Sequence, residues 1–174
     1  MISAQAPLPN GAYLLPKDAD PKMMHLLLEE WCDRASDGYK FSPLTENDIR
    51  DVENDLTPLL HGKRAEGYEI PEFPGDYVRQ YVGFSRDGRR FLCGNAVRID
   101  SRSLDRLRRI ASVDTVPLIL ADGGTETFGF EYDVEARQFT SFAVGGTVAG
   151  GYIPRPPIRL DPLPIRGLPH IPFP

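Results

Sequence analysis

Proline recurs at roughly every third position through the last part of the chain, from Tyr152 to Pro174. Each proline ring fixes φ near about −65°, removes a backbone N–H donor and pushes the preceding residue toward extended geometry. Neither a helix nor a central strand can form over such a segment. We therefore expect residues 151–174, called the arm below, to run as an extended or polyproline II chain.

The remainder of the chain is long enough for one domain. Of its 174 residues, 41% are hydrophobic, and about 130 residues remain for a single core once the two proline-bearing ends are set aside. We expect an extended N-terminal segment over residues 1–19, one domain over residues 20–150, and the arm after it.

The charge balance narrows the class of partner. The chain carries 25 acidic and 20 basic residues and a net charge of −5, which argues against nucleic acid or an anionic membrane surface as the main partner. No apolar run approaches the roughly 18 residues that a membrane-spanning helix needs. The sequence therefore predicts an acidic, soluble protein with no nucleic-acid or membrane partner.

Two cysteines leave the compartment open. Cys32 and Cys93 match no metal or redox motif, and the interpretation that we favour is a pair of small buried apolar residues. A bridge between them remains the alternative if the chain is exported. The N-terminus lacks the basic start and apolar middle of a signal peptide, although Ala4-Gln5-Ala6 resembles the end of one. The chain as written indicates the cytoplasm, and an upstream signal removed by processing would indicate the periplasm or secretion.

Three segments have helical signals. Asp20-Pro21 is a cap followed by a first-turn proline, and apolar residues then recur at helical spacing until Gly38. Residues 45–48 read as a capping-box variant, and Pro58 should kink the helix that follows or restart it as one turn ending at Gly62. A short helix is expected over residues 103–111. The apolar stripes of the first two helices are Met24, Leu27, Leu28 and Trp31, and Ile49, Val52, Leu56, Leu59 and Leu60.

Alternating patterns predict the strands. Two runs, residues 77–84 and 89–97, flank Asp87-Gly88, which is a strong hairpin signal. Residues 127–132 and 138–144 form a second hairpin pattern around a polar loop. Residues 116–121 lie between the hairpins as a short apolar run and fit a central strand.

These elements predict an α+β fold. We expect an antiparallel five-stranded meander, made of the two hairpins and the central strand, with two to three helices packed on one face of the sheet. The aromatic row Phe128, Phe130 and Tyr132 is expected to face the helices. Three glycines inside strand patterns, Gly83, Gly94 and Gly129, indicate bulges or a close approach to the backbone.

A search for chemistry finds no supported catalytic, cofactor or metal site. The three histidines have no metal-ligand spacing, and phosphate-loop and nucleophile-elbow patterns are missing. The leading enzymatic hypothesis is a thiol nucleophile at Cys93, with His61 as base and Asn95 or an acidic side chain as orienter. A buried, unreactive thiol is the interpretation that we favour over it. The carboxylates Asp122, Glu126, Glu131 and Asp133 fit no known loop and read as solvated turn and strand residues.

Two surface features point to a partner. Arg102, Arg106 and Arg109 fall at i, i+4 and i+7 and gather on one side of the expected third helix, where they could grip carboxylates or phosphates. In the arm, residues 153–159 fit an apolar-Pro-x-apolar-Pro-x-basic order that docks in aromatic-lined grooves, with Pro154, Pro156, Pro157 and Arg159 as its contacts. The arm is also too apolar for a free linker, so it should lie along its own domain or a neighbouring subunit.

The sequence thus predicts a small non-catalytic interaction protein of the inhibitor, immunity-type or assembly-subunit kind. Its partner would be another protein or a second copy of itself, contacted through residues 152–174 and the arginine-bearing helix. The alternative is a small enzyme or ligand-binding domain with its site on the concave side of the sheet. A polar pocket with His61, Cys93 or two carboxylates converging would favour that alternative.

Overall fold

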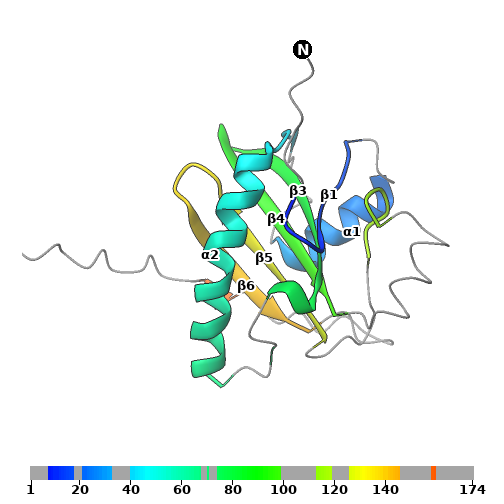
Figure 1. Cartoon of the computed structure of the whole chain (residues 1–174). Helices are drawn as coiled ribbons and strands as arrows, with labels where there is room; N and C mark the ends of the chain where they lie inside the picture. Colours follow the sequence, from blue (N-terminus) through cyan, green and yellow to red (C-terminus); the bar gives the residue numbers. More distant parts are fainter. Residues whose placement is uncertain are drawn as a thin grey trace, which may run out of the picture.

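The computed structural model describes residues 8–17, 21–32, 40–67, 70, 74–98, 113–118, 126–145 and 158–159. The elements are β1 (Ala12–Leu14), α1 (Pro21–Trp31), β2 (Lys40–Phe41), α2 (Glu46–Ala65), the 3-10 turn η2 (Pro74–Asp76), β3 (Val78–Arg86), β4 (Arg89–Val97), β5 (Thr127–Asp133), β6 (Gln138–Val144) and β7 (Ile158–Arg159). The α+β class expected from the sequence is confirmed (Figure 1).

The sheet is mixed, so the expectation of a purely antiparallel five-stranded meander is wrong. Its strand order is β1-β3-β4-β5-β6-β7, and β2 pairs with β3 as well. β1 runs parallel to β3, and the remaining pairs are antiparallel. β1 lies in the segment for which only extended chain was expected, because three residues are too few to produce a visible alternation in the sequence.

Both expected hairpins are confirmed. Asp87 and Gly88 join β3 to β4 with φ of 54° and 76°, the positive angles that a tight two-residue turn requires. β5 and β6 form the second hairpin, which has a register irregularity between Glu131 and Tyr132. These two hairpins make the centre of the sheet.

No strand separates the hairpins. β4 pairs directly with β5 along seven residue pairs from Phe91 to Val97, and residues 113–118 form turns and irregular chain rather than the start of a strand. The expected central strand is therefore wrong over Val116–Leu118, and its remaining residues lie outside those described. Pro117, which supplies no N–H, disfavours a central strand position there.

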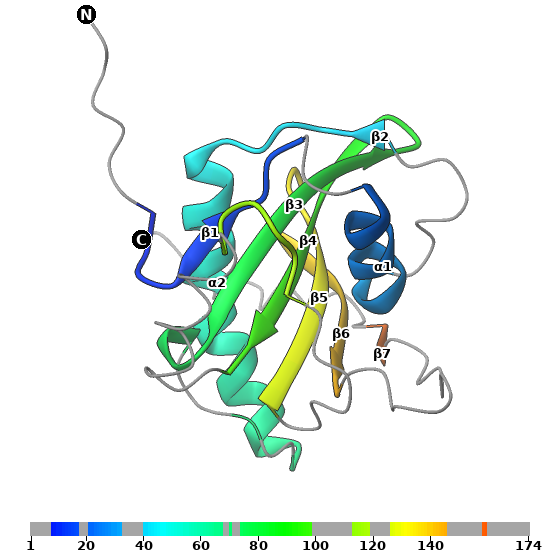
Figure 2. The same cartoon turned by 90° about the vertical axis from the view of Figure 1, so that its right-hand side faces the viewer.

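The two described helices pack on opposite faces of the sheet, not on one face as expected. α2 covers the face that carries Tyr81 and Phe130, whereas α1 covers the face that carries Val82 and Cys93 (Figure 2). Because successive strand residues point to opposite sides, each strand contributes to two separate apolar clusters. The expected third helix lies outside the described residues.

α2 begins as expected and ends later than expected. Thr45 caps it: the Asp48 N–H donates to Thr45 Oγ1 at 3.2 Å, and the Thr45 N–H donates to Asp48 Oδ2 at 2.7 Å. The helix then continues through Pro58 as one element to Ala65. Its buried residues Ile49, Val52, Leu56 and Leu60 hold it on the sheet, so the loss of one intrahelical hydrogen bond at proline does not end it.

The aromatic row of β5 faces α2, as expected. Phe128 and Phe130 are fully buried, and the ring centroids of Phe128 and Tyr77 lie 4.6 Å apart in an edge-on arrangement. Phe142 of β6 stacks on Phe128 with centroids 5.5 Å apart. This layer therefore fills the interior between the sheet and α2.

Glycines mark close approaches within the sheet. A Cβ on Gly94 would lie 2.3 Å from the Phe130 ring, and a Cβ on Gly129 would lie 2.1 Å from the Trp31 indole. Only glycine, which has no side chain, fits at both positions. This confirms the expected close backbone approach.

Candidate functional site

The arm contributes one strand to the sheet. Ile158 and Arg159 form β7 and pair antiparallel with Phe142 and Ser141 of β6. Among the β6 residues that the structure describes, Ser141 and Phe142 are the ones paired on the side away from β5. This pairing gives the arm an attachment to an edge strand, and we take the β6 edge with β7 as the candidate functional site.

β7 lies in a proline-free part of the arm. Residues 158–161, between Pro157 and Pro162, form one of two such four-residue stretches, and residues 165–168 form the other. Only residues with an N–H can donate to a β ladder, so the arm can pair with an edge strand where proline is missing. The sequence therefore allows a strand at residues 158–159 but does not select it over residues 165–168.

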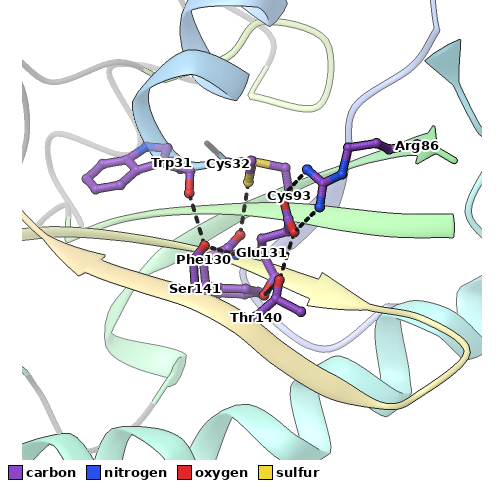
Figure 3. The surroundings of a disulfide bond; sticks show 8 residues. All are labelled: Trp31, Cys32, Arg86, Cys93, Phe130, Glu131, Thr140 and Ser141. Atoms are coloured by element: carbon purple, nitrogen blue, oxygen red, sulfur yellow. Dashed lines mark hydrogen bonds and ion pairs between the residues drawn. A yellow bond between two sulfur atoms is a disulfide. The ribbon is translucent and has the colours of Figure 1, made fainter. Parts of the chain in front are cut away.

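A polar cluster lies beside this edge on the α1 face of the sheet (Figure 3). Glu131 accepts two hydrogen bonds from Arg86, at 3.2 and 2.9 Å, and one from Thr140 Oγ1 at 2.8 Å. Ser141 Oγ accepts from the Glu131 N–H at 3.1 Å and donates to Trp31 O at 3.5 Å. The carboxylate is thus fully engaged, and the cluster joins the β6 edge to the end of α1.

The same face holds a disulfide between Cys32 and Cys93. It ties the residue after α1 to the middle of β4, and both cysteines are buried. The two cysteines are buried as expected, but they are not free thiols. The alternative interpretation, a bridge between them, is the one that the structure shows. Sequence spacing could not decide between them, because the two sulfurs meet only when α1 packs on the sheet.

The proposed thiol-nucleophile set is not assembled. The Cys93 sulfur is in the disulfide, so it cannot form a thiolate. His61 lies exposed on α2, which covers the opposite face of the sheet. Asn95 is buried and donates to Gln80 Oε1 and to Leu118 O, at 3.3 and 2.6 Å.

The described carboxylates that the sequence analysis singled out each have an arginine partner. Glu131 pairs with Arg86 at 2.9 Å, and Glu126 with Arg98 at 3.5 Å. Asp133 pairs with Arg89. Asp122 lies outside the described residues. Carboxylates held by separate arginines do not form an acid and base pair around a shared substrate position.

A buried ion pair lies on the α2 face. Arg79 is 2% exposed and donates to Glu53 Oε1 at 2.7 Å, and the Tyr81 hydroxyl donates to the same oxygen. Burial raises the pKa of the Tyr81 phenol well above its ordinary value, and the Glu53 charge raises it further. Both Nη atoms of Arg79 donate to backbone carbonyls, so this group stabilises the fold.

One of the predicted partner contacts lies on a described element. Arg159 belongs to β7. The others lie outside the described residues: Pro154, Pro156, Pro157, Arg102, Arg106 and Arg109.

Over the described ranges, no group of three or more His, Cys, Asp or Glu side chains could hold a metal ion. Within those same ranges, no helix has both the length and the apolar character needed to cross a bilayer. No family model matches this chain, and no curated protein and no solved structure is significantly similar to it.

Proposed function

We propose that this chain is a small interaction protein without catalysis of its own, and that it binds another protein or a second copy of itself through the arm. The observation that supports this proposal most is the pairing of β7 with β6. An arm that adds a strand to a sheet edge in its own chain has the backbone geometry to add one to an edge elsewhere.

The chemistry of strand addition suits a proline-rich arm. Main-chain hydrogen bonds give the affinity, and the side chains that flank them give the specificity. The prolines on both sides of residues 158–161 limit pairing to a short stretch, and this limit protects an exposed strand from open-ended association. Arg159 in this stretch and the contacts Pro154, Pro156 and Pro157 before it form the proposed binding segment.

The arginine-bearing helix is the proposed second contact. Arg102, Arg106 and Arg109 would face one side of that helix and bind carboxylates of the partner by bidentate hydrogen bonds. This contact rests on the spacing in the sequence.

The chemistry of the described residues supports a non-catalytic role. Cys93 is bridged, and the carboxylates Glu126, Glu131 and Asp133 each pair with their own arginine. Apolar clusters pack on both faces of the sheet. This packing disfavours the alternative of a ligand site on a concave face of the sheet.

The disulfide supports a place of action outside the reducing cytosol. Disulfides persist in the periplasm, at cell surfaces and in secreted proteins, where thiols are oxidised. We therefore favour the periplasmic or secreted alternative for this chain over the cytoplasmic one.

A truncation tests the proposed function. The chain ending at Pro157 lacks β7 and the arm beyond it, and it should keep the disulfide and the fluorescence of its one tryptophan. Light scattering on the purified chains, and affinity purification from the native host, would compare it with the full chain. The proposal expects the truncated chain to lose a self-association or a bound protein that the full chain has. Equal masses and equal captured proteins for both chains would overturn it.

A further inference from the structure

Two buried amide side chains form a unit on the α1 face of the sheet. Gln80 is 0% exposed and Asn95 is 2% exposed. They occupy paired positions on β3 and β4, and Asn95 Nδ2 donates to Gln80 Oε1 at 3.3 Å. Burying two amides is costly unless they form hydrogen bonds, so their partners indicate what the pair is for.

Their further described partners are all backbone groups of one segment. Gln80 Nε2 donates to Val113 O and to Val116 O, both at 2.8 Å. Gln80 Oε1 accepts from the Leu118 N–H at 2.6 Å, and Asn95 Nδ2 donates to Leu118 O at 2.6 Å. The pair thus holds the N–H and the C=O of one residue, as a neighbouring strand would. We call Gln80 and Asn95 the amide clamp.

Because the amide clamp binds backbone groups, its choice of segment depends on chain shape. Pro117 is buried against the fold and restricts the backbone, Val116 and Leu118 are half-buried, and Asp114 and Thr115 are exposed. The segment in the clamp therefore has the pattern Asp-x-aliphatic-Pro-aliphatic over residues 114–118.

The arm contains the same pattern a second time. Residues 161–165 read Asp-Pro-Leu-Pro-Ile, and residues 114–118 read Asp-Thr-Val-Pro-Leu. Aspartate and the central proline coincide, and the two aliphatic positions agree in character. The residue that differs in kind lies at the position of Thr115, which is exposed in the clamp.

We infer that the amide clamp is a peptide-binding site for extended Asp-x-aliphatic-Pro-aliphatic segments, and that its ligand is residues 161–165 of a second copy of this chain, in exchange for residues 114–118. This inference rests on the proposed function, because it adds a second contact of the arm, through residues 161–165, to the strand pairing proposed for β7.

The direction of β7 favours a second copy over the chain's own arm. Asn95 is in one row of the sheet with Gly129 and Ala143. β7 runs from Ile158, opposite Phe142, to Arg159, opposite Ser141, and so leads away from that row. The described strand therefore points away from the clamp at its Arg159 end.

The chain's own segment sets the expected affinity. Residues 114–118 are tethered beside the clamp, and a short tether gives an effective concentration in the millimolar range. An added peptide must compete with this segment, so half-saturation should lie on the order of a millimolar. Weakening the tethered segment should tighten binding of the peptide.

The test uses the full chain labelled with ¹⁵N and a synthetic peptide of residues 158–168. The side-chain amide signals of Gln80 and Asn95 should shift on titration into the millimolar range, and a shuffled peptide should leave them in place. Leu118→Pro removes the N–H that donates to Gln80 Oε1 and so weakens the tethered segment. The peptide concentration at half-saturation should therefore fall by about ten-fold. Thr115→Ser changes the exposed residue of the same segment that the shared pattern leaves open, and it should leave the titration unchanged.

Gln80→Leu should abolish the shift of Asn95, and tryptophan fluorescence reports whether that variant folds. If Gln80→Leu does not fold, the inference is tested by whether Leu118→Pro lowers the peptide concentration at half-saturation. Unshifted amides with the full chain and with Leu118→Pro would overturn the inference, as would equal shifts with the shuffled peptide. These outcomes are separate from failure of the proposed function, which appears as unchanged association after removal of the arm.

Discussion

Arg79 Nε donates a hydrogen bond of 2.7 Å to Glu53 Oε1, and this ion pair links β3 to α2 within the core. The same guanidinium donates to Pro74 O, Tyr77 O and Asn10 O, at 2.5, 2.7 and 2.9 Å. One charged side chain therefore holds the N-terminal strand segment, the turn before β3 and the long helix together. Its charge is compensated by a carboxylate whose side chain is 9% exposed.

Glu53→Gln should strongly destabilise the protein. The substitution keeps the shape of the side chain and leaves the buried Arg79 charge without its counter-charge, which costs about 3–5 kcal/mol in comparable buried pairs. Chemical denaturation followed by tryptophan fluorescence measures the change. The matched control is Glu126→Gln, whose pair with Arg98 is about half exposed on both sides and should cost at most about 1 kcal/mol. Similar losses for the two variants would contradict this account of the buried pair.

Alkaline pH should reduce stability through Tyr81. Its pKa is raised in the folded state by burial and by Glu53, so the unfolded phenol loses its proton first, from about pH 10. The stabilising contribution is complete below that pH and is lost as pH rises toward the folded pKa, with a slope of about 1.4 kcal/mol per pH unit. Urea denaturation above about pH 10 measures how steeply the free energy of unfolding falls with pH. In Tyr81→Phe this fall should be smaller by about 1.4 kcal/mol per pH unit. An unchanged slope in that variant would count against the assignment.

Loss of the disulfide should lower the free energy of unfolding. The bridge closes a loop with a sequence separation of 61, for which the chain-entropy model gives about 4 kcal/mol. The double variant Cys32→Ala, Cys93→Ala should show this loss in denaturant, and adding a reductant should bring the parent chain toward it. The variant itself should not respond to reductant. A parent chain whose stability is unaffected by complete reduction would refute the prediction.

Two glycine substitutions should have opposite signs. Gly129→Ala places a methyl group against Trp31, so we expect a loss of about 1–3 kcal/mol and a shift in the emission of the one tryptophan. Gly62→Ala lies within α2 with nothing within 4 Å of the added Cβ, and should gain up to about 1 kcal/mol. Thermal and chemical melts of the two variants check the signs. A gain at Gly129 would mean that the indole does not pack on this strand.

The sequence was most informative where the structure is local. Asp87-Gly88 predicts the first hairpin because a two-residue turn requires positive φ, and the Thr45 and Asp48 pair predicts the start of α2 because it satisfies free N–H groups. Such signals act over a few residues. They do not depend on how the elements later pack.

Features that depend on packing escaped prediction. The pattern of an amphipathic helix does not show which face of a sheet the helix covers. The sequence therefore could not show that α1 and α2 pack on opposite faces. The parallel pairing of β1 with β3 and the bridge between Cys32 and Cys93 join residues far apart in the chain. Gln80 and Asn95 lie within the expected strands 77–84 and 89–97, but their burial appears only in the structure.

Proline substitutions in β7 change the ability of the arm to pair without shortening it. Replacing both Ile158 and Arg159 by proline removes the two N–H groups of β7, and replacing Arg166 and Gly167 by proline is the matched control outside β7. Sedimentation of the full chain and both variants, purified and in extract of the native host, measures association. If the arm binds by strand pairing, the β7 variant loses the larger species and the control keeps it. A β7 variant that still associates as the full chain does would contradict the central claim that the arm binds by strand pairing.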